Sequence, residues 1–536
     1  MRSLSLAAGL LALSAAATHT LAHQAAFTLP SPDQPQALQF ASTSASTPAS
    51  FAGEKVVRFS TASSTQHQQL VQHAHRLGLD VWAAQLGAAC GTEAYGCVDV
   101  RLAADTHNED PFRFSETSAD EIMASLMQPF AGEEQIGART MIEDLGVLVA
   151  AQQGRVDEAR TEEALRSQAW HRDYHTFDEI VAYMHVLEQG YPGYARVVEI
   201  GKTHEGRPIL ALQVSSGLGV QPPSPEPPTE PQPGPPANAT SSAKLGIVIT
   251  GGQHAREWIS TSASLFFASD LLHAALGKPA SNSTTVDTLK KNSRKNRKKK
   301  ATPTFTRAQA RAILATFTLT VIPVANPDGY VYSWGTNRMW RKNRQPNRFP
   351  SGLFCKGVDL NRNYDYAFAS SSSSATSACS EMYPGDAAFS AAEARAVAAY
   401  VQDDAHNVRA FVDLHSYGQL WMYPFSHSCA APVADEEDLL ELALGAVSAL
   451  KARFGRQFTP GKVCAVYAVG GGNAVDWAYA SAEGGKKRVK WSYSVELRDG
   501  GTYGFLLPAR QIVPASQEVG AALAYMLQFI ARKDGR

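Results

Sequence analysis

The feature that most constrains the fold is an alternation of short apolar runs with helical stretches after about residue 173. Four runs, rich in β-branched and aromatic residues, read as buried strands: ALQVSS, KLGIVITG, FTLTVIPV and VRAFVDLHS. Strands that alternate with helices form an α/β sheet covered by helices. We therefore predict one large α/β domain over residues 173–536.

A smaller patterned region, residues 53–150, precedes this domain. KVVRFS and CVDVRLA read as strands, HQQLVQHAHRLGL and SADEIMASLMQPF as helices, and TMIEDLGVLVAAQQ as a short strand followed by an amphipathic helix. This pattern predicts a small α+β unit. Residues 151–172 are charged and punctuated by arginines, which predicts a connecting helix accessible to proteases.

The N-terminus has the composition of a secretory signal over residues 1–22, with one arginine, an apolar run and the small residues Thr20 and Ala22. A buried N-terminal helix is the alternative. Residues 23–52 form a low-complexity lead-in. Later runs are shorter than the roughly 20 apolar residues of a membrane span, so we expect a secreted protein without one, with the vacuole or cell wall as other destinations.

The balance of charges limits which macromolecules the chain could attract. The chain has 49 basic and 50 acidic residues among 536, so no global charge attracts nucleic acid.

In an oxidising compartment six cysteines favour three disulfides, and local spacing suggests Cys90 with Cys97, Cys355 with Cys379, and Cys429 with Cys464. Some could instead be free, buried thiols.

Two insertions interrupt the large domain. Residues 218–243 are proline-rich and acidic, and residues 276–306 contain the basic run LKKNSRKNRKKK. Both read as solvated surface loops. The basic run could also bind polyanions or be cleaved by a dibasic-specific protease. Sequons at Asn238 and Asn282 lie in these stretches and are candidate glycosylation sites.

The stretch GGQHAREWIS places His254 and Glu257 three residues apart, directly after an apolar run. The spacing alone is weak, because a histidine and a glutamate at this distance share one face of many ordinary helices. His415 follows the strand AFVDL, at an end where open α/β sheets bind ligands. Three such ligands leave a fourth position for water, as catalytic zinc sites require.

Five segments in order resemble the zinc metallocarboxypeptidases of the pancreatic A/B type, over about residues 173–530. They are HAREW, NPDGYVYSWGTNRMWRK, GVDLNRNYD, DLHSYGQLWMYP and VELRDGGTYGFLLPARQI. KVVRFS, VDV and TMIEDLGVL resemble the family's inhibitory pro-domain. The resemblance implies a mixed β-sheet flanked by helices, preceded by a small α+β open-sandwich pro-domain.

The resemblance also assigns site residues. It implies one Zn²⁺ held by His254, Glu257 and His415, with Asp359 orienting the first histidine. Glu496 matches the general base and Arg341 the residue that stabilises the oxyanion. The residues that match positions contacting the substrate are Arg256, Asn361, Arg362, Ser416, Tyr417, Tyr467 and Val475, with Asn361 and Arg362 binding the terminal carboxylate.

Two of these assignments bear on the substrate. Tyr467 matches a mobile tyrosine that closes over substrate, although the segment to Trp477 is one residue longer than in the pancreatic enzymes and contains three consecutive glycines. A plain turn is the alternative. Val475 matches the floor of the specificity pocket, which implies a preference for hydrophobic or aromatic C-terminal residues.

Together these features predict a monomeric, secreted carboxypeptidase precursor that hydrolyses the last bond of peptides or proteins. We expect cleavage between Arg155 and Arg172 to release the pro-domain. One alternative is a catalytically silent cell-wall protein, because some fungal homologues lack the glutamate that this chain keeps as Glu496. The others are an enzyme with a different terminal preference and a polyanion-binding module built on the lysine-rich loop.

Overall fold

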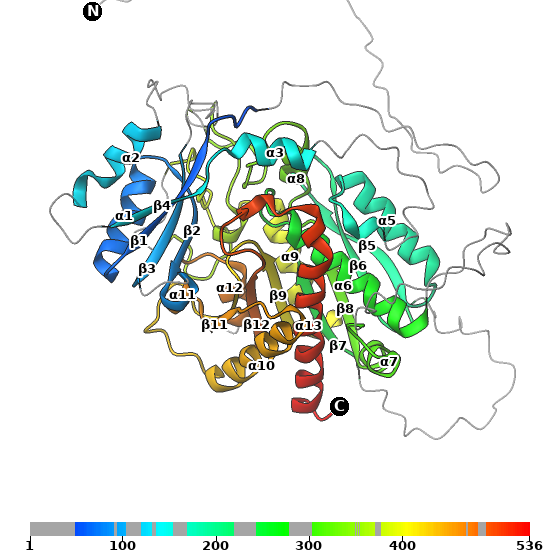
Figure 1. Ribbon diagram of the computed structural model, residues 1–536. Coiled ribbons are helices and arrows are strands. Elements are labelled where there is room, and N and C mark those ends of the chain that lie inside the picture. The colour runs from blue at the N-terminus through cyan, green and yellow to red at the C-terminus, as the bar shows by residue number, and fades with distance from the viewer. Residues whose placement is uncertain are drawn as a thin grey trace, which may run out of the picture. The chain divides into compact units, whose positions relative to one another are not determined.

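Two β-sheets organise the computed structural model (Figure 1), one of four strands and one of eight. The structure describes residues 49–90, 94–102, 119–130, 136–153, 169–218, 243–277, 303–348, 350, 352, 354–369, 377–467, 470–480 and 489–536. Both sheets belong to one unit of the chain, Ser44–Arg536. The predicted signal, the sequons and most of both insertions and of the connecting segment lie outside the described residues.

The four-stranded sheet is antiparallel, with strand order β2-β3-β1-β4. Its strands are β1 (Lys55–Thr61), β2 (Asp80–Leu86), β3 (Gly96–Leu102) and β4 (Gly137–Ile142). Helices α1 (Ser64–Arg76) and α2 (Ala119–Met127) pack on one face, and α3 (Leu145–Gln153) follows β4. This is the predicted α+β unit. The sequence reading missed β2, in which four consecutive residues, 82–85, are buried and burial does not alternate.

The eight-stranded sheet has the order β11-β10-β12-β9-β7-β8-β6-β5. It is mixed: β11 with β10, β12 with β9, and β9, β7 and β8 pair in parallel, whereas the other neighbours are antiparallel. Its strands are β5 (Ala195–Lys202), β6 (Pro208–Val214), β7 (Leu245–Thr250), β8 (Phe317–Ile322), β9 (Val408–His415), β10 (Leu420–Tyr423), β11 (Thr459–Lys462) and β12 (Trp491–Glu496). The four predicted strands are confirmed as β6 to β9.

Helices cover both faces of this sheet because its strands present apolar side chains alternately to each side. Along β7, Ile247 and Ile249 belong to one buried cluster, and Val248 belongs to another. The helices are α5 (Phe177–Gly190), α6 (Trp258–Leu276), α7 (Arg307–Thr316), α8 (Pro327–Gly335), α9 (Ala392–Gln402), α10 (Glu436–Phe454), α11 (Val463–Val466), α12 (Ala474–Ala480) and α13 (Ile512–Lys533). Residues of α5, α6, α10 and α13 lie in the first cluster, and residues of α9 and α12 in the second. The predicted mixed sheet flanked by helices is confirmed.

Three boundaries differ from the sequence reading. Phe51 is buried, so packed structure begins before the predicted end of the lead-in. Trp170 packs in the core of the large sheet, although the large domain was predicted to open at residue 173. Phe305 is buried in the same core, which shortens the second insertion at its C-terminal end.

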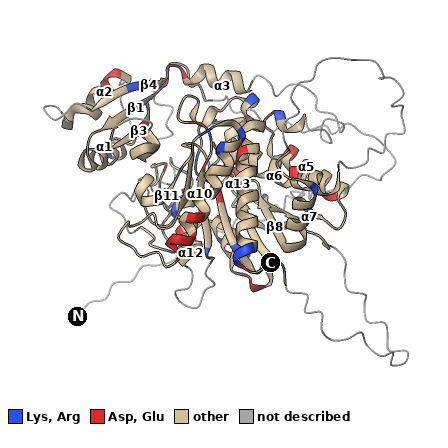
Figure 2. Cartoon of the chain, turned by 60° about the horizontal axis from the view of Figure 1, so that its bottom comes forward, with Lys and Arg blue, Asp and Glu red and all other residues tan. Residues whose placement is uncertain are grey.

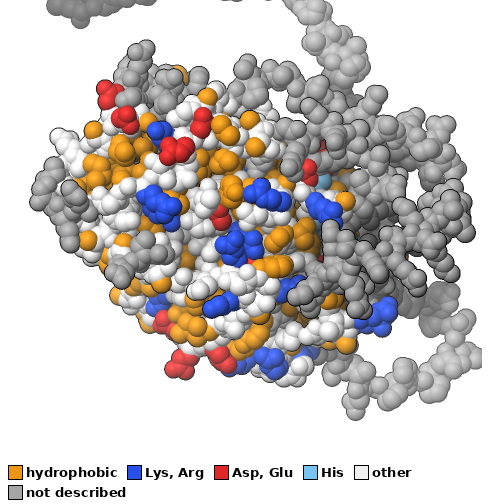
Figure 3. Space-filling model, in the orientation of Figure 1, with side chains coloured by type: hydrophobic (Ala, Val, Ile, Leu, Met, Phe, Trp, Pro, Cys, Tyr) orange, Lys and Arg blue, Asp and Glu red, His pale blue; other side chains and the backbone are white. Residues whose placement is uncertain are grey.

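The covalent cross-links agree with the sequence reading. The structure forms the disulfides Cys90–Cys97, Cys355–Cys379 and Cys429–Cys464. Within the described residues one helix, α6, is long and apolar enough to span a membrane, and 78% of its apolar window is buried in the fold. Acidic and basic residues are spread over the elements in Figure 2, and basic side chains lie apart from one another on the face in Figure 3.

Candidate active site

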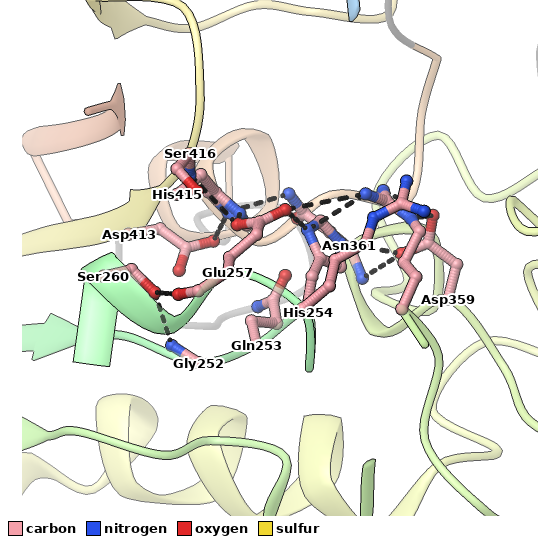
Figure 4. A network of polar contacts seen from close by, with 12 residues as sticks. Gly252, Gln253, His254, Glu257, Ser260, Asp359, Asn361, Asp413, His415 and Ser416 are labelled. Atoms are coloured by element: carbon pink, nitrogen blue, oxygen red, sulfur yellow. Dashed lines mark hydrogen bonds and ion pairs between the residues drawn. The ribbon is translucent and has the colours of Figure 1, made fainter. Parts of the chain in front are cut away.

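Two neighbouring parallel strands bring the three predicted ligands together. His254 and Glu257 lie between β7 and α6, and His415 is the last residue of β9. Because β7 and β9 are adjacent and parallel, their carboxyl ends meet at one edge of the sheet. The ligand atoms of the three residues lie within 4.8 Å of one another, and all three residues are buried (Figure 4).

Glu257 lies between the two histidines. Its Oε1 is 2.7 Å from His254 Nδ1 and its Oε2 is 3.0 Å from His415 Nδ1. The backbone N–H of Ser416 donates to the same Oε2 at 3.1 Å. The Nδ1 atom of each histidine therefore faces the centre of the group.

The outer nitrogen of each histidine faces a buried carboxylate. His254 Nε2 lies 3.1 Å from Asp359 Oδ1, and His415 Nε2 lies 2.7 Å from Asp413 Oδ2. A histidine that donates Nε2–H to a carboxylate keeps the Nδ1 lone pair for a metal. The resemblance pointed to Asp359 but not to Asp413. The signal for Asp413 was its spacing, because residues two apart on a strand face the same side.

These charges shift the ionisation of the group. Burial disfavours the ionised form of Glu257, but His254 and His415 outweigh it and hold its pKa below the usual value. Burial likewise opposes ionisation of Asp359, yet Arg341 and His254 lower its pKa well below the usual range. Two histidines and an ionised glutamate form the donor set of known catalytic zinc sites, so these residues fit a zinc ion.

Glu496 lies beside this group, at the end of an interior strand. β12 runs between β10 and β9, and Glu496 is the register partner of His415. The residue is only 9% exposed, and its Oε2 has no donor within hydrogen-bonding distance in the described part of the chain. Burial raises the pKa of Glu496 to about 8, although the charge of His415 opposes this shift. Glu496 is therefore not a solvent-facing charge on an edge strand.

Arg341 is fixed against the metal-binding group. Its Nη2 and Nε donate to Asp359 Oδ2 at 2.9 and 3.3 Å, and its Nη1 lies 3.1 Å from His254 Nδ1. The guanidinium is buried, but Asp359 and Glu257 raise its pKa further, so the charge is retained.

Asn361 and Arg362 lie in the short turn that follows Asp359. The Asn361 amide oxygen accepts from the backbone N–H of Ala474 at 2.9 Å, and its amide nitrogen lies 3.2 Å from His415 Nε2. Arg362 donates to the backbone oxygen of Asn361, and no ion pair of its guanidinium with a described carboxylate is within 4.0 Å. A cation and an amide therefore face the same cavity as the metal-binding group.

Tyr467 and Val475 flank the glycine-rich segment. Tyr467 caps α11 and lines the cavity. Gly472 has φ of +76°, and an added Cβ would lie 2.2 Å from the backbone oxygen of Arg362, so a glycine is required there. Val475 is 3% exposed and packs in an apolar cluster with Leu420, Met422, Val463 and Val466, behind the lining of the cavity.

Arg256 and Tyr417 contact the N-terminal region, residues 49–153. Arg256 Nη1 donates to both carboxylate oxygens of Asp80, at 2.8 and 3.0 Å. The Tyr417 hydroxyl donates to Asp99 Oδ2 at 2.8 Å, and Asp99 also pairs with Arg58 at 2.6 Å. Sequence reasoning missed these partners, which come from two strands of the small sheet.

A cavity of about 600 Å³ separates the N-terminal region from the metal-binding group. Its lining combines residues of α1 and β2 with the three ligands, Glu496, Arg341 and Arg362. The disulfide partners Cys429 and Cys464 also line it, next to Tyr467. The small sheet therefore covers the site.

Comparison with known proteins agrees with this geometry. Residues 180–522 match the family described as Zinc carboxypeptidase. The "Inactive metallocarboxypeptidase ECM14" of Ajellomyces dermatitidis is 32% identical over 526 residues, covering 92% of this chain and 75% of that protein. Carboxypeptidase A1 of Homo sapiens is 31% identical over 481 residues, covering 89% of this chain and 94% of that protein. The crystal structure of thrombin activatable fibrinolysis inhibitor superposes with a TM-score of 0.65 at 26% identity, over 90% of this chain and 100% of that one. The chain therefore belongs to the zinc carboxypeptidase family.

Proposed function

We propose that this protein is the precursor of an active zinc carboxypeptidase that removes C-terminal residues from peptides or proteins. The observation that carries the proposal is the position of Glu496, a buried carboxylate opposite the ligand His415. A protein that only bound peptide ends would have no need for a carboxylate there. The buried donor set of two histidines and a glutamate supports the same reading.

Each residue of the site has a role in this proposal. A zinc ion bound by His254, Glu257 and His415 would polarise the scissile carbonyl, acidify a water molecule and favour ionisation of a nearby carboxylate. Glu496 takes the proton of the attacking water and delivers it to the leaving amine. Arg341, which already faces His254, stabilises the charge that develops on the carbonyl oxygen.

The other side of the cavity suits a terminal carboxylate. Arg362 supplies a guanidinium and Asn361 an amide, and a fixed guanidinium can bind a carboxylate through two hydrogen bonds. The preference for hydrophobic or aromatic terminal side chains rests on the resemblance at Val475, whose apolar cluster packs against Tyr467 of the cavity lining. We propose that Tyr467, which lines the same cavity, closes over the bound residue.

We further propose that residues 53–150 act as a pro-domain. Asp80 pairs with Arg256, and Asp99 accepts a hydrogen bond from Tyr417, so two groups that would otherwise meet a substrate are engaged. Three disulfides suit a secreted protein. Cleavage between Arg155 and Arg172 would break the covalent link between the two sheets.

A second candidate is a catalytically inactive, carboxypeptidase-like protein of the secretory pathway. What favours it is similarity to a relative whose name describes it as inactive. The two candidates make opposite predictions for turnover, because binding of peptide ends needs no base.

The experiment uses the purified full chain. Treatment with trypsin, verified by mass spectrometry, precedes incubation with peptides ending in Phe, Leu, Lys or Glu, with and without a zinc chelator. We expect release of Phe and Leu that the chelator stops, and no release by a matched Glu496→Gln protein. Folded, processed protein that releases no terminal residue would rule out the enzyme, whereas release of Lys alone would reject only the apolar preference.

A further inference from the structure

Thr250 is a buried hydroxyl at the end of an otherwise apolar strand. All six residues of β7, LGIVIT, are buried, and Thr250 is 0% exposed. A valine would fill nearly the same space, so packing alone does not explain the hydroxyl. Because burying a hydroxyl is costly unless it is hydrogen-bonded, the identity of its partner shows what the residue does.

The partner of Thr250 is the carboxylate of Asp413. The two residues are register partners on the adjacent parallel strands β7 and β9. Thr250 Oγ1 lies 2.5 Å from Asp413 Oδ1 and 3.4 Å from the backbone oxygen of Val412. The hydroxyl has one proton, and the shorter contact is the stronger hydrogen bond. Thr250 therefore donates to Asp413.

The other oxygen of Asp413 faces a metal-binding residue. Asp413 Oδ2 lies 2.7 Å from His415 Nε2 (Figure 4), whereas the amide nitrogen of Asn361 lies farther from the same atom, at 3.2 Å. Asp413 is thus held at one oxygen by Thr250 and presents the other to the ring of His415. The contacts form a chain from the hydroxyl through the carboxylate to the imidazole.

The hydroxyl restricts how the carboxylate can turn. The last torsion of an aspartate side chain has a broad energy profile, so a carboxylate held at only one oxygen can rotate. With Thr250 in place, both oxygens of Asp413 are fixed, and so is the direction in which His415 donates. Nδ1 of His415 then keeps its orientation toward Glu257, at the centre of the metal-binding group.

We propose that Thr250 is a positioning residue of the zinc site, which holds the Asp413 carboxylate so that Asp413 in turn orients the ligand His415. Thr250 acts through Asp413 and touches neither the metal nor the substrate. The inference rests on the zinc site of the proposed function but does not require turnover. It extends the support of His415 to a second strand, β7, which also leads into the ligands His254 and Glu257.

The test measures zinc affinity of the full-length protein by competition with a chromogenic chelator. We expect Thr250→Val to raise the Kd for zinc by about 3- to 10-fold, less than the roughly 10- to 100-fold expected when the outer partner of a ligand is itself changed. Thr250→Ser keeps the hydroxyl and should keep the affinity. In the double variant Thr250→Val, Asp413→Asn, the Kd should match that of Asp413→Asn within about twofold, because residues that act through one another are not additive.

Thr320→Val provides the matched control. Thr320 is 3% exposed, lies on the neighbouring strand β8 as the register partner of Val248, and has its hydroxyl 2.8 Å from that of Tyr400. Neither Thr320 nor Tyr400 lines the cavity. The same substitution there should lower the melting temperature of the protein and leave the Kd for zinc unchanged. If Thr250→Val does not fold, Thr250→Ala is compared with Thr320→Ala in the same way.

The outcomes separate this inference from the proposed function. A Thr250→Val protein that binds zinc as tightly as the unmodified protein overturns the inference and leaves the function intact, since the hydroxyl then serves only stability. A Thr250→Val effect that adds to that of Asp413→Asn overturns the action through Asp413. The expected affinities, combined with no peptide cleavage by the processed protein, overturn only the function. Absence of zinc binding by the unmodified protein contradicts both.

Discussion

Glu496 and His415 are register partners on the adjacent parallel strands β12 and β9, so the proposed base and a proposed metal ligand are held by the same interior hydrogen-bond ladder. Both side chains are buried, and neither strand lies at an edge of the sheet. Their relative position is therefore fixed by the sheet and does not depend on a loop. This relationship separates metal binding from catalysis, because Glu496 can be changed without touching a ligand.

Glu496→Gln should abolish turnover while leaving the metal in place. Glutamine keeps the size of the side chain but cannot accept the proton of a water molecule, and loss of a general base costs about 10²- to 10⁴-fold in rate. Steady-state kcat on a peptide ending in Phe, together with the zinc content of the same sample, checks this prediction. A variant that loses zinc in proportion to activity would show that Glu496 supports the metal rather than the chemistry.

Asp413→Asn and Asp359→Asn should both weaken zinc binding, by about 10- to 100-fold, because each removes the charge that orients a ligand histidine. They should differ in catalysis. Asp359 also binds Arg341, so its loss should lower kcat even at saturating zinc, whereas Asp413→Asn should recover when zinc is added. Competition with a chromogenic chelator measures the affinity, and kcat against zinc concentration measures the recovery. Equal kcat for both variants at saturating zinc would contradict the role given to Arg341.

Asp99→Asn should loosen the contact between the two sheets. Asp99 is 1% exposed and is shared by Arg58 and the Tyr417 hydroxyl, so its neutralisation leaves Arg58 without its partner. Breaking one side of a buried ion pair costs about 3 to 5 kcal/mol. We expect faster hydrogen exchange in β2 and β3 of the uncleaved protein.

Glu143→Gln is the control for that experiment. Glu143 pairs with Lys55 at 4.0 Å, but its side chain is 80% exposed, and exposed pairs contribute little. Its exchange pattern should match that of the unmodified protein. An Asp99→Asn pattern that also matches would mean that the contact with Tyr417 does not hold the small sheet in place.

Much of the fold could be predicted from the sequence because the central strands are buried on both sides. The run LGIVIT is apolar at nearly every position, and all six residues of β7 are buried. The edge strand β11 has no such run of apolar residues. Thr459–Lys462 pairs with β10 but contains no large apolar residue, so its strand conformation depends on its neighbour.

The site was predictable only in part. His254, Glu257 and His415 lie in segments that resemble motifs of the family, and this resemblance identified them as ligands. The structure brings the three residues together. Asp80 could not be found in this way. It lies 176 residues from Arg256, and their contact depends on how one sheet packs against the other. Local patterns carry no information about that arrangement.

The uncleaved protein should lose stability in its N-terminal region as the pH falls from about 6.5 to 4. His67 and His75 are both on α1 and line the cavity, and Nε2 of His67 and both ring nitrogens of His75 are buried without described partners. Burial lowers the pKa of each to about 4, and for His75 the charge of Arg362 adds to this effect while Asp80 opposes it. In the unfolded chain a histidine has a pKa near 6.5.

The sign of this effect follows from the proton count. Between pH 6.5 and 4 the unfolded state binds more protons than the folded state, so the free energy of unfolding decreases as the pH is lowered. Below pH 4 the free energy of unfolding levels off. Each buried histidine should remove about 2 kcal/mol between pH 7 and 4.5. Hydrogen exchange of α1 at pH 7, 5.5 and 4.5 measures the loss. The double variant His67→Gln, His75→Gln should be less sensitive to pH, and His185→Gln, which changes a histidine whose side chain is 47% exposed, should behave like the unmodified protein. If the double variant keeps the full pH dependence, the acid sensitivity must come from other groups, such as Asp80, whose pKa is lowered by Arg256 and Arg101.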